Sequence, residues 1–115
     1  MKGLEKCIAL ASKVIIYVPA TVHADKPVSN EKEVKATAEL LAKLFGGATS
    51  SSAIGYWMSQ TAGLIREKTT IVFAYCQQAD LEAHIEEVVA YCETLKTAMS
   101  QESIALEVNG TMYFV

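Results

Sequence analysis

The 115-residue sequence has few arginines, histidines and prolines: two histidines, two prolines and a single arginine, Arg66. With a formal net charge of -3, it offers no basic patch for the backbone of a DNA or RNA duplex, so we expect no such partner. No apolar run approaches the ~18 residues that cross a membrane, and we expect no membrane partner either.

Cysteine and histidine are also too sparse for a scaffold or a metal site. Cys7, Cys76 and Cys92 are an odd set without CxxC spacing, which favours a reducing, cytoplasmic setting over disulfides. We expect Cys76 and Cys92 to be buried and inert, since both fall on apolar faces. His23 and His84 stand apart from other metal-ligating residues, so we expect no metal and no cofactor. No pair of carboxylates at a fixed spacing indicates catalytic residues.

Hydrophobic residues make up 51% of the chain and mark several strands. Residues 14–18 are apolar at every position and end at Pro19, which predicts a strand covered on both faces. Alternating residues predict strands over 53–59 and 64–76, joined by a turn at 61–63. Residues 103–108 and 112–115 follow as short strands around the tight turn Asn109-Gly110.

Helical periodicity predicts two helices. Asn30 and Glu33 resemble a capping box at the start of the first helix, and Gly46-Gly47 ends it. The second helix is expected to begin at an Asp80 cap. Its apolar stripe is the clearest pattern in the chain: Leu81, Ile85, Val88, Cys92, Leu95 and Met99.

Together these elements predict an α+β fold of the ferredoxin-like type. The order is β-α-β-β-α-β, with an antiparallel sheet, two helices on one face and a C-terminal β-hairpin. We expect a tail or short helix at residues 1–12 and a single domain at 13–115. The strands carry apolar residues on both faces while the helices cover only one, which predicts a homo-oligomer, a dimer or larger.

The second predicted strand contains the most suggestive candidate for ligand binding. Tyr56 and Trp57 follow Gly55, an arrangement that lets a flat ligand such as a nucleobase stack closely on an aromatic ring. The alternative is that Tyr56 faces the core and Trp57 fills an interface between subunits.

The third predicted strand carries Arg66, Glu67 and Lys68 across the hairpin from this aromatic pair. Arg66 and Lys68 suit a phosphate or carboxylate group, and Glu67 is either a partner of Arg66 or an acid–base group. The alternative is a cross-strand salt bridge on a solvated hairpin. The candidate ligand-binding set is therefore Tyr56, Trp57, Arg66, Glu67 and Lys68.

Several short motifs resemble a family of small uncharacterised proteins of bacteriophages, prophages and other mobile elements. These motifs are Leu44-Phe45-Gly46-Gly47-Ala48-Thr49, Gly55-Tyr56-Trp57, Gly63 with Glu67, Gln101, and Tyr113-Phe114-Val115. The resemblance implies a viral or mobile-element origin and a location in the host cytoplasm. By analogy with small phage proteins, it suggests a counter-defence factor.

Three functions follow from these expectations. The first is an oligomeric binding protein that sequesters a nucleotide-like signalling ligand. The second is an inhibitor of a host defence protein that uses the acidic face of the second helix, with Glu82, Glu86, Glu87 and Glu93. The third is a small nucleotide hydrolase that uses Glu67, His23 or Tyr56.

Overall fold

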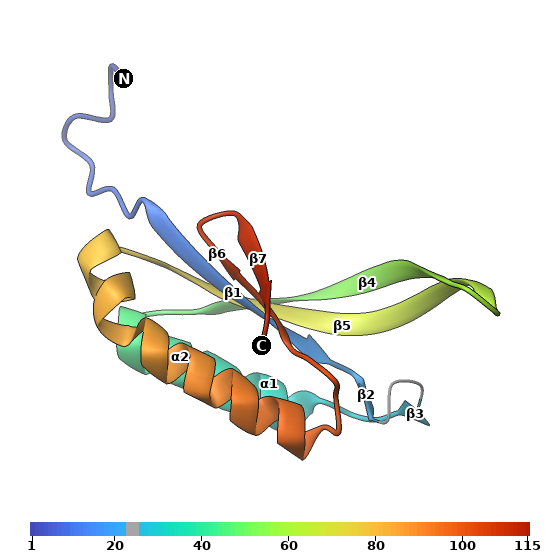
Figure 1. The fold of residues 1–115 in the computed structure, drawn as a ribbon. Coiled ribbons are helices and arrows are strands. Elements are labelled where there is room, and N and C mark those ends of the chain that lie inside the picture. The colour runs from blue at the N-terminus through green and yellow to red at the C-terminus, as the bar shows by residue number, and fades with distance from the viewer. Residues whose placement is uncertain (23–25) are drawn as a thin grey trace.

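The computed structural model describes residues 1–22 and 26–115, so His23 and Asp25 lie outside the described residues (Figure 1). Neither helix in the described part of the chain has the length and apolarity needed to cross a membrane. The elements in chain order are β1 (Ser12–Pro19), β2 (Thr21–Val22), β3 (Lys26–Pro27), α1 (Glu31–Phe45), β4 (Thr49–Ser59), β5 (Gly63–Cys76), α2 (Gln78–Ala98), β6 (Ala105–Val108) and β7 (Thr111–Phe114).

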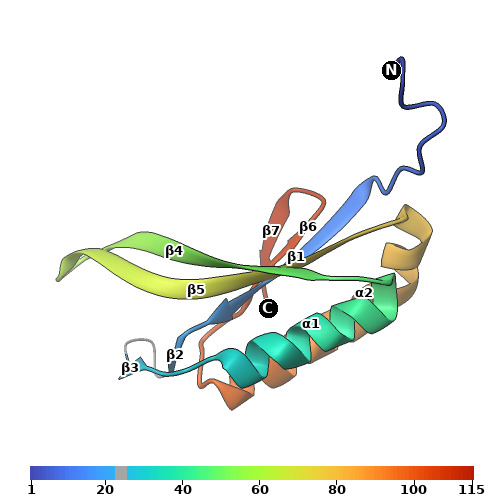
Figure 2. The same cartoon turned by 180° about the vertical axis from the view of Figure 1, so that it is seen from behind.

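The main sheet has five strands in the order β4-β5-β1-β6-β7, and every neighbouring pair is antiparallel. Helices α1 and α2 lie side by side on one face of this sheet (Figures 1 and 2). The predicted ferredoxin-like α+β fold with a C-terminal hairpin is confirmed. Strands β2 and β3 form a separate two-stranded ladder within the predicted loop after β1.

Strand β1 is the centre of the hydrophobic core. Val14, Ile16 and Val18 are completely buried on the helix-covered face. On the opposite face Ile15 is only 7% exposed, while Tyr17 is partly exposed. The apolar run is therefore buried on one face and partly covered on the other by neighbouring side chains.

The helices pack on the core through the predicted stripes. Leu81, Val88 and Cys92 of α2 are buried, and α1 contributes Leu41. Thr37 of α1 is also fully buried. Its hydroxyl is nevertheless hydrogen-bonded, since Oγ1 lies 2.7 Å from the Tyr91 hydroxyl and donates to the Glu33 carbonyl. This hydrogen-bonded pair links the two helices through otherwise apolar surroundings.

One predicted side-chain cap and two predicted boundaries were wrong. Asn30 makes no side-chain cap, because its Nδ2 donates to the Val18 carbonyl and to Thr70 Oγ1. Helix α2 begins at Gln78, before the expected Asp80 cap. Strand β4 begins at Thr49 rather than Ala53, since the serine run pairs with β5 although its side chains are exposed.

The β4–β5 hairpin is longer than the rest of the sheet. Its ladder runs from the Thr49–Phe73 pair to the Ser59–Gly63 pair, whereas β1 pairs with β5 only as far as Thr69. The hairpin consequently projects beyond the helices, and the molecule measures 53 × 28 × 21 Å along its principal axes (Figure 1).

Candidate functional site

The candidate site lies where β1 ends and the longer β5 continues. Pro19 pairs with Thr69 as the last residue of β1 on this ladder. Proline has no N–H to donate, which suits the end of a strand. Residues 63–68 of β5 pair with β4 on one side, and β1 has already left the other side. The result is a notch along one edge of the hairpin.

The connection after β1 forms the second wall of this notch. The Val28 amide donates to the Ala20 carbonyl at 2.9 Å and turns the chain back. Gln101 Nε2 donates to the Thr21 carbonyl at 2.7 Å, which ties the connection to the segment after α2. These two hydrogen bonds fix the connection after β1 in its place beside the hairpin.

Between the two walls lies a cavity of about 830 Å³, a volume within the usual range for small-molecule sites. The hairpin contributes both charged and aromatic side chains to it, and the connection contributes small and apolar ones. The lining residues are Ala20, Thr21, Pro27, Val28, Ser29, Trp57, Ile65, Arg66, Glu67 and Lys68.

Strand register decides which candidate side chains share a face of the hairpin. Trp57 stands opposite Ile65, and Gly55 opposite Glu67, so Trp57 and Glu67 lie on one face. Tyr56 stands opposite Arg66 on the other face. Tyr56 is 59% exposed because the hairpin extends past the helices there, which contradicts the alternative that placed it in the core.

The charges of the site alternate along β5. Arg66 and Lys68 are exposed, and Glu67 between them is partly buried. The ion pairs within residues 1–22 and 26–115 are Lys43–Glu39 and Lys96–Glu93. A cross-strand salt bridge of Arg66 with a described carboxylate is therefore not formed. Arg66 and Lys68 lie on the Tyr56 face of the hairpin, whereas Glu67 lies on the Trp57 face.

Gly55 leaves open space beside Glu67. A Cβ atom at Gly55 would lie 3.9 Å from the Glu67 carbonyl oxygen, which is an ordinary van der Waals distance. The backbone there does not require glycine, since Gly55 is not among the residues with positive φ. Neither the backbone conformation nor a close contact therefore requires glycine at position 55.

Four of the five predicted ligand-binding residues line one cavity, and Tyr56 lies outside its lining. Sequence reasoning missed the wall from the connection: Ala20, Thr21, Pro27, Val28 and Ser29. The predicted strand order contained the signal for them. In a ferredoxin-like sheet the end of the first strand lies beside the start of the third, so residues after Pro19 must come near residues 64–69.

The other candidate groups have structural roles. Cys76 and Cys92 are buried as predicted. Burial raises the pKa of Cys92 to about 11, with a smaller contribution from Glu93. The His84 ring packs edge-on against Phe45 with 5.9 Å between ring centroids. Among the described residues there is no group of three metal-ligating side chains.

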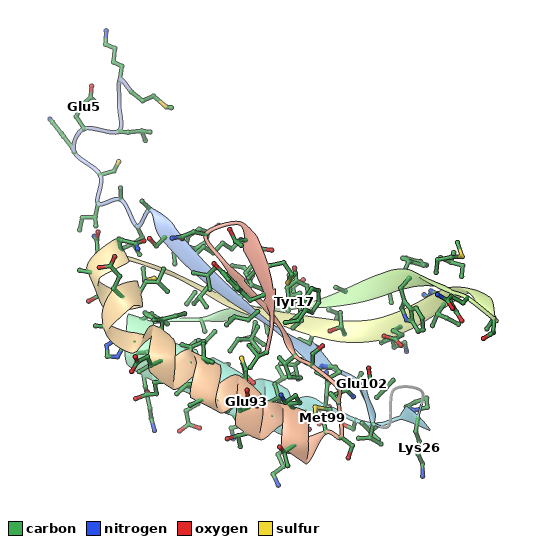
Figure 3. All side chains as sticks on the ribbon, viewed as in Figure 1. Glu5, Tyr17, Lys26, Glu93, Met99 and Glu102 are labelled. Atoms are coloured by element: carbon green, nitrogen blue, oxygen red, sulfur yellow. The ribbon has the colours of Figure 1, made fainter. Side chains whose placement is uncertain are left out.

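The face of the sheet opposite the helices is partly apolar. Lys13 Nζ lies 4.5 Å from the Phe73 ring centroid and 5.0 Å from that of Tyr75. Tyr17, labelled in Figure 3, donates from its hydroxyl to Glu107 at 3.4 Å, and burial followed by the charge of Glu107 raises its pKa. Tyr75 is 49% exposed on this face, so apolar surface remains open there.

No family model and no curated protein matches the sequence. Two of the solved structures that match are of a phage SAM lyase. The complex with S-methyl-5′-thioadenosine (MTA) has a TM-score of 0.67 and 21% identity, covering 97% of this chain and 94% of the other. The apo state has a TM-score of 0.64 and 20% identity, covering 91% and 88%. The chain therefore shares, over nearly its whole length, the fold of a phage SAM lyase.

Proposed function

We propose that this protein binds S-adenosylmethionine (SAM) or a closely related thioether nucleoside in the hairpin cavity. The observation that carries the proposal is the composition of that cavity. Trp57 and Glu67 project from one face of the hairpin and the cations Arg66 and Lys68 from the other, and all four line the cavity opposite a wall of small side chains.

In this proposal the adenine base stacks on the Trp57 ring. Its side chain is 50% exposed on the face that it shares with Glu67. Stacking of a base on an aromatic ring contributes about 1–3 kcal/mol and needs no base-specific hydrogen bond. Gly55 on the same face leaves room for the base to approach the strand.

The charges favour SAM over a nucleoside phosphate. A phosphate group is attracted by Arg66 and Lys68 but repelled by Glu67, which lines the same cavity. SAM carries a sulfonium and an ammonium as well as a carboxylate, so it suits a cavity that Glu67 lines from the Trp57 face and that Arg66 and Lys68 line from the opposite face. The similarity in fold to a phage SAM lyase whose structure is a complex with MTA supports this ligand class.

In this proposal the protein also associates with a second copy of itself. The cavity opens to one side, and several large apolar side chains elsewhere on the hairpin and on the second sheet face are exposed: Tyr56, Met58, Leu64, Tyr75, Met112 and Phe114. Burial of such surface favours association. The proposed active form is a homo-oligomer whose subunits meet through these surfaces.

A second candidate function is cleavage of SAM to MTA, favoured by the partly buried Glu67 carboxylate in the cavity. In such a reaction the bond from sulfur to the methionine γ-carbon breaks, and sulfur keeps the electron pair as a neutral thioether. Either an oxygen of the fragment's own carboxylate forms a bond to the γ-carbon and closes a lactone, or the β-carbon gives a proton to the Glu67 carboxylate and its C–H electron pair becomes a double bond to the γ-carbon. Removing SAM from a host cytoplasm would make the protein a counter-defence factor of the type that its phage resemblance implies.

Trp57 is the only tryptophan, so its fluorescence reports binding directly. We expect SAM to change the emission at lower concentration than S-adenosylhomocysteine, which lacks the sulfonium charge, and MTA to bind more weakly still. ATP serves as the phosphate control and should bind least. Equal affinity for ATP and SAM, or no response to any of the four, would refute the proposed ligand.

Cleavage is tested separately, by mass spectrometry of SAM incubated with the protein. Appearance of MTA in proportion to protein, and its loss in Glu67→Gln, supports the lyase. Binding of SAM without any MTA leaves sequestration as the function.

A further inference from the structure

The first eleven residues form an exposed arm. Residues 1–11, called the arm below, precede β1 and extend away from the body of the molecule (Figures 1 and 2). Gln77 Nε2 donates to the Ala9 carbonyl at 3.2 Å and fixes the base of the arm. Leu4 is 53% exposed, Ile8 90% and Leu10 45%, so the arm presents apolar side chains to solvent.

A second cavity lies at the other end of the sheet, between α2 and the C-terminal hairpin. Its volume is about 450 Å³, and we call it the α2–β7 groove. Its lining is apolar apart from one carboxylate: Ile85, Val89, Glu93, Leu106, Val108, Tyr113, Phe114 and Val115. None of these residues lines the cavity proposed to bind SAM.

Strand β7 provides a backbone docking edge above this groove. It is the last strand of the sheet order and pairs only with β6 among the described strands. An edge of this kind accepts an added strand through main-chain hydrogen bonds. Tyr113 stands opposite Leu106, which is buried, so this side of β7 faces the groove.

The arm has the pattern that such an added strand requires. Ile8 and Leu10 are two residues apart and would point to the same side of an extended segment. Ala9 and Ala11 would point to the opposite side. An added strand made from these residues can therefore insert two apolar side chains into the groove while its alanines face outward.

Charge complementarity supports the same pairing. Helix α2 carries five carboxylates and one lysine, and Lys96 is already paired with Glu93. Glu82 and Glu86 stand three residues before Ile85 and Val89, on the neighbouring part of the helix surface. The arm carries Lys2 and Lys6 against the single acidic residue Glu5.

The direction of the arm selects a second copy rather than its own groove. Figure 3 shows Glu5 far from Glu93, and the arm leaves β1 on a course away from α2. We propose that the arm of one copy adds to the outer edge of β7 in a second copy and places Ile8 and Leu10 in the α2–β7 groove of that copy. The proposal does not depend on SAM or MTA.

The test compares self-association of the full chain with that of three variants by sedimentation velocity without ligand. The variants are a deletion of residues 1–10, Ile8→Asp and Ala9→Asp. The two substitutions add the same charge at adjacent positions on opposite sides of the proposed strand. We expect the deletion and Ile8→Asp to weaken association by at least about tenfold and Ala9→Asp to change it by less than about threefold.

Three results would overturn the proposal: a strictly monomeric full chain, a deletion that leaves association unchanged, or equal effects of the two aspartates. Hydrogen exchange distinguishes docking in a second copy from docking within one chain. Protection of β7 amides should fall when the full chain is diluted, and protection that persists in the diluted monomer also overturns it. Because no nucleoside is present, failure of SAM to bind would not alter these outcomes.

Discussion

Trp57→Ala is the most direct test of the ligand site. The side chain is half exposed, so truncation removes the contacts of roughly half a tryptophan, about 100 Å² of buried surface. At ~25 cal/mol per Å² this lowers the free energy of unfolding by about 2.5 kcal/mol at most. Since small domains have about 5–15 kcal/mol of stability, the variant should remain folded.

The loss of binding free energy in Trp57→Ala is expected to be similar in size to the loss of unfolding free energy. The change in the dissociation constant is much easier to measure. Removing one base–aromatic stack costs about 1–3 kcal/mol, which is roughly a 5- to 150-fold increase in the dissociation constant. The assay is titration calorimetry with MTA, a ligand that has no sulfonium to cleave. Trp57→Phe keeps a smaller ring and should give an intermediate constant.

Met58→Ala is the matched control. Met58 neighbours Trp57, is 71% exposed and does not line the cavity. It should leave MTA affinity within about threefold of the unmodified protein. If Trp57→Ala is folded by circular dichroism and binds MTA as well as Met58→Ala does, the stacking argument is refuted.

Three further predictions concern the site and the core. Glu67→Gln should weaken SAM by about 1.5–3 kcal/mol and leave MTA nearly unchanged in calorimetry, because only SAM carries a sulfonium; equal losses would contradict that role. Gly55→Ala should keep or slightly raise the urea midpoint, since its Cβ meets no close atom, yet weaken MTA; unchanged binding would show that this surface is not used. The pKa of Cys92 is about 11 when folded, so the stability that its protonated form contributes is complete below the ordinary thiol pKa of about 8.5 and is lost as pH rises through 11. Urea unfolding at about pH 8 and about pH 11 should show a loss of roughly 2–3 kcal/mol that Cys92→Ala lacks, and an equal loss in both proteins would contradict it.

The fold was predictable because its helices and strands have strong periodic patterns. The α2 stripe is buried at every expected position except Ile85, which is partly buried, and Asn109-Gly110 forms the expected turn with positive φ at both residues. Predictions of a cap and a boundary failed where a tertiary contact outweighed a local preference. The Asn30 side chain donates to β1 and β5 instead of capping its own helix, and the serines after Ala48 extend β4 because β5 supplies a partner strand.

The candidate site was only half predictable for a related reason. Trp57, Arg66, Glu67 and Lys68 stand out by residue type on a strand pattern. The opposite wall consists of small residues such as Ala20 and Ser29 without chemical signature, and only the pairing of Pro19 with Thr69 brings that wall to the hairpin.

The two faces of the projecting hairpin suggest a division of roles. Trp57 and Glu67 share one face and line the cavity. Met58 and Leu64 pair with each other on the opposite face, where they are 71% and 61% exposed, and neither lines the cavity. A ligand in the cavity therefore does not account for them, whereas contact with another protein surface would. We expect the ligand to contact the Trp57 face and the free edge of β5, and another protein surface to contact Met58 and Leu64.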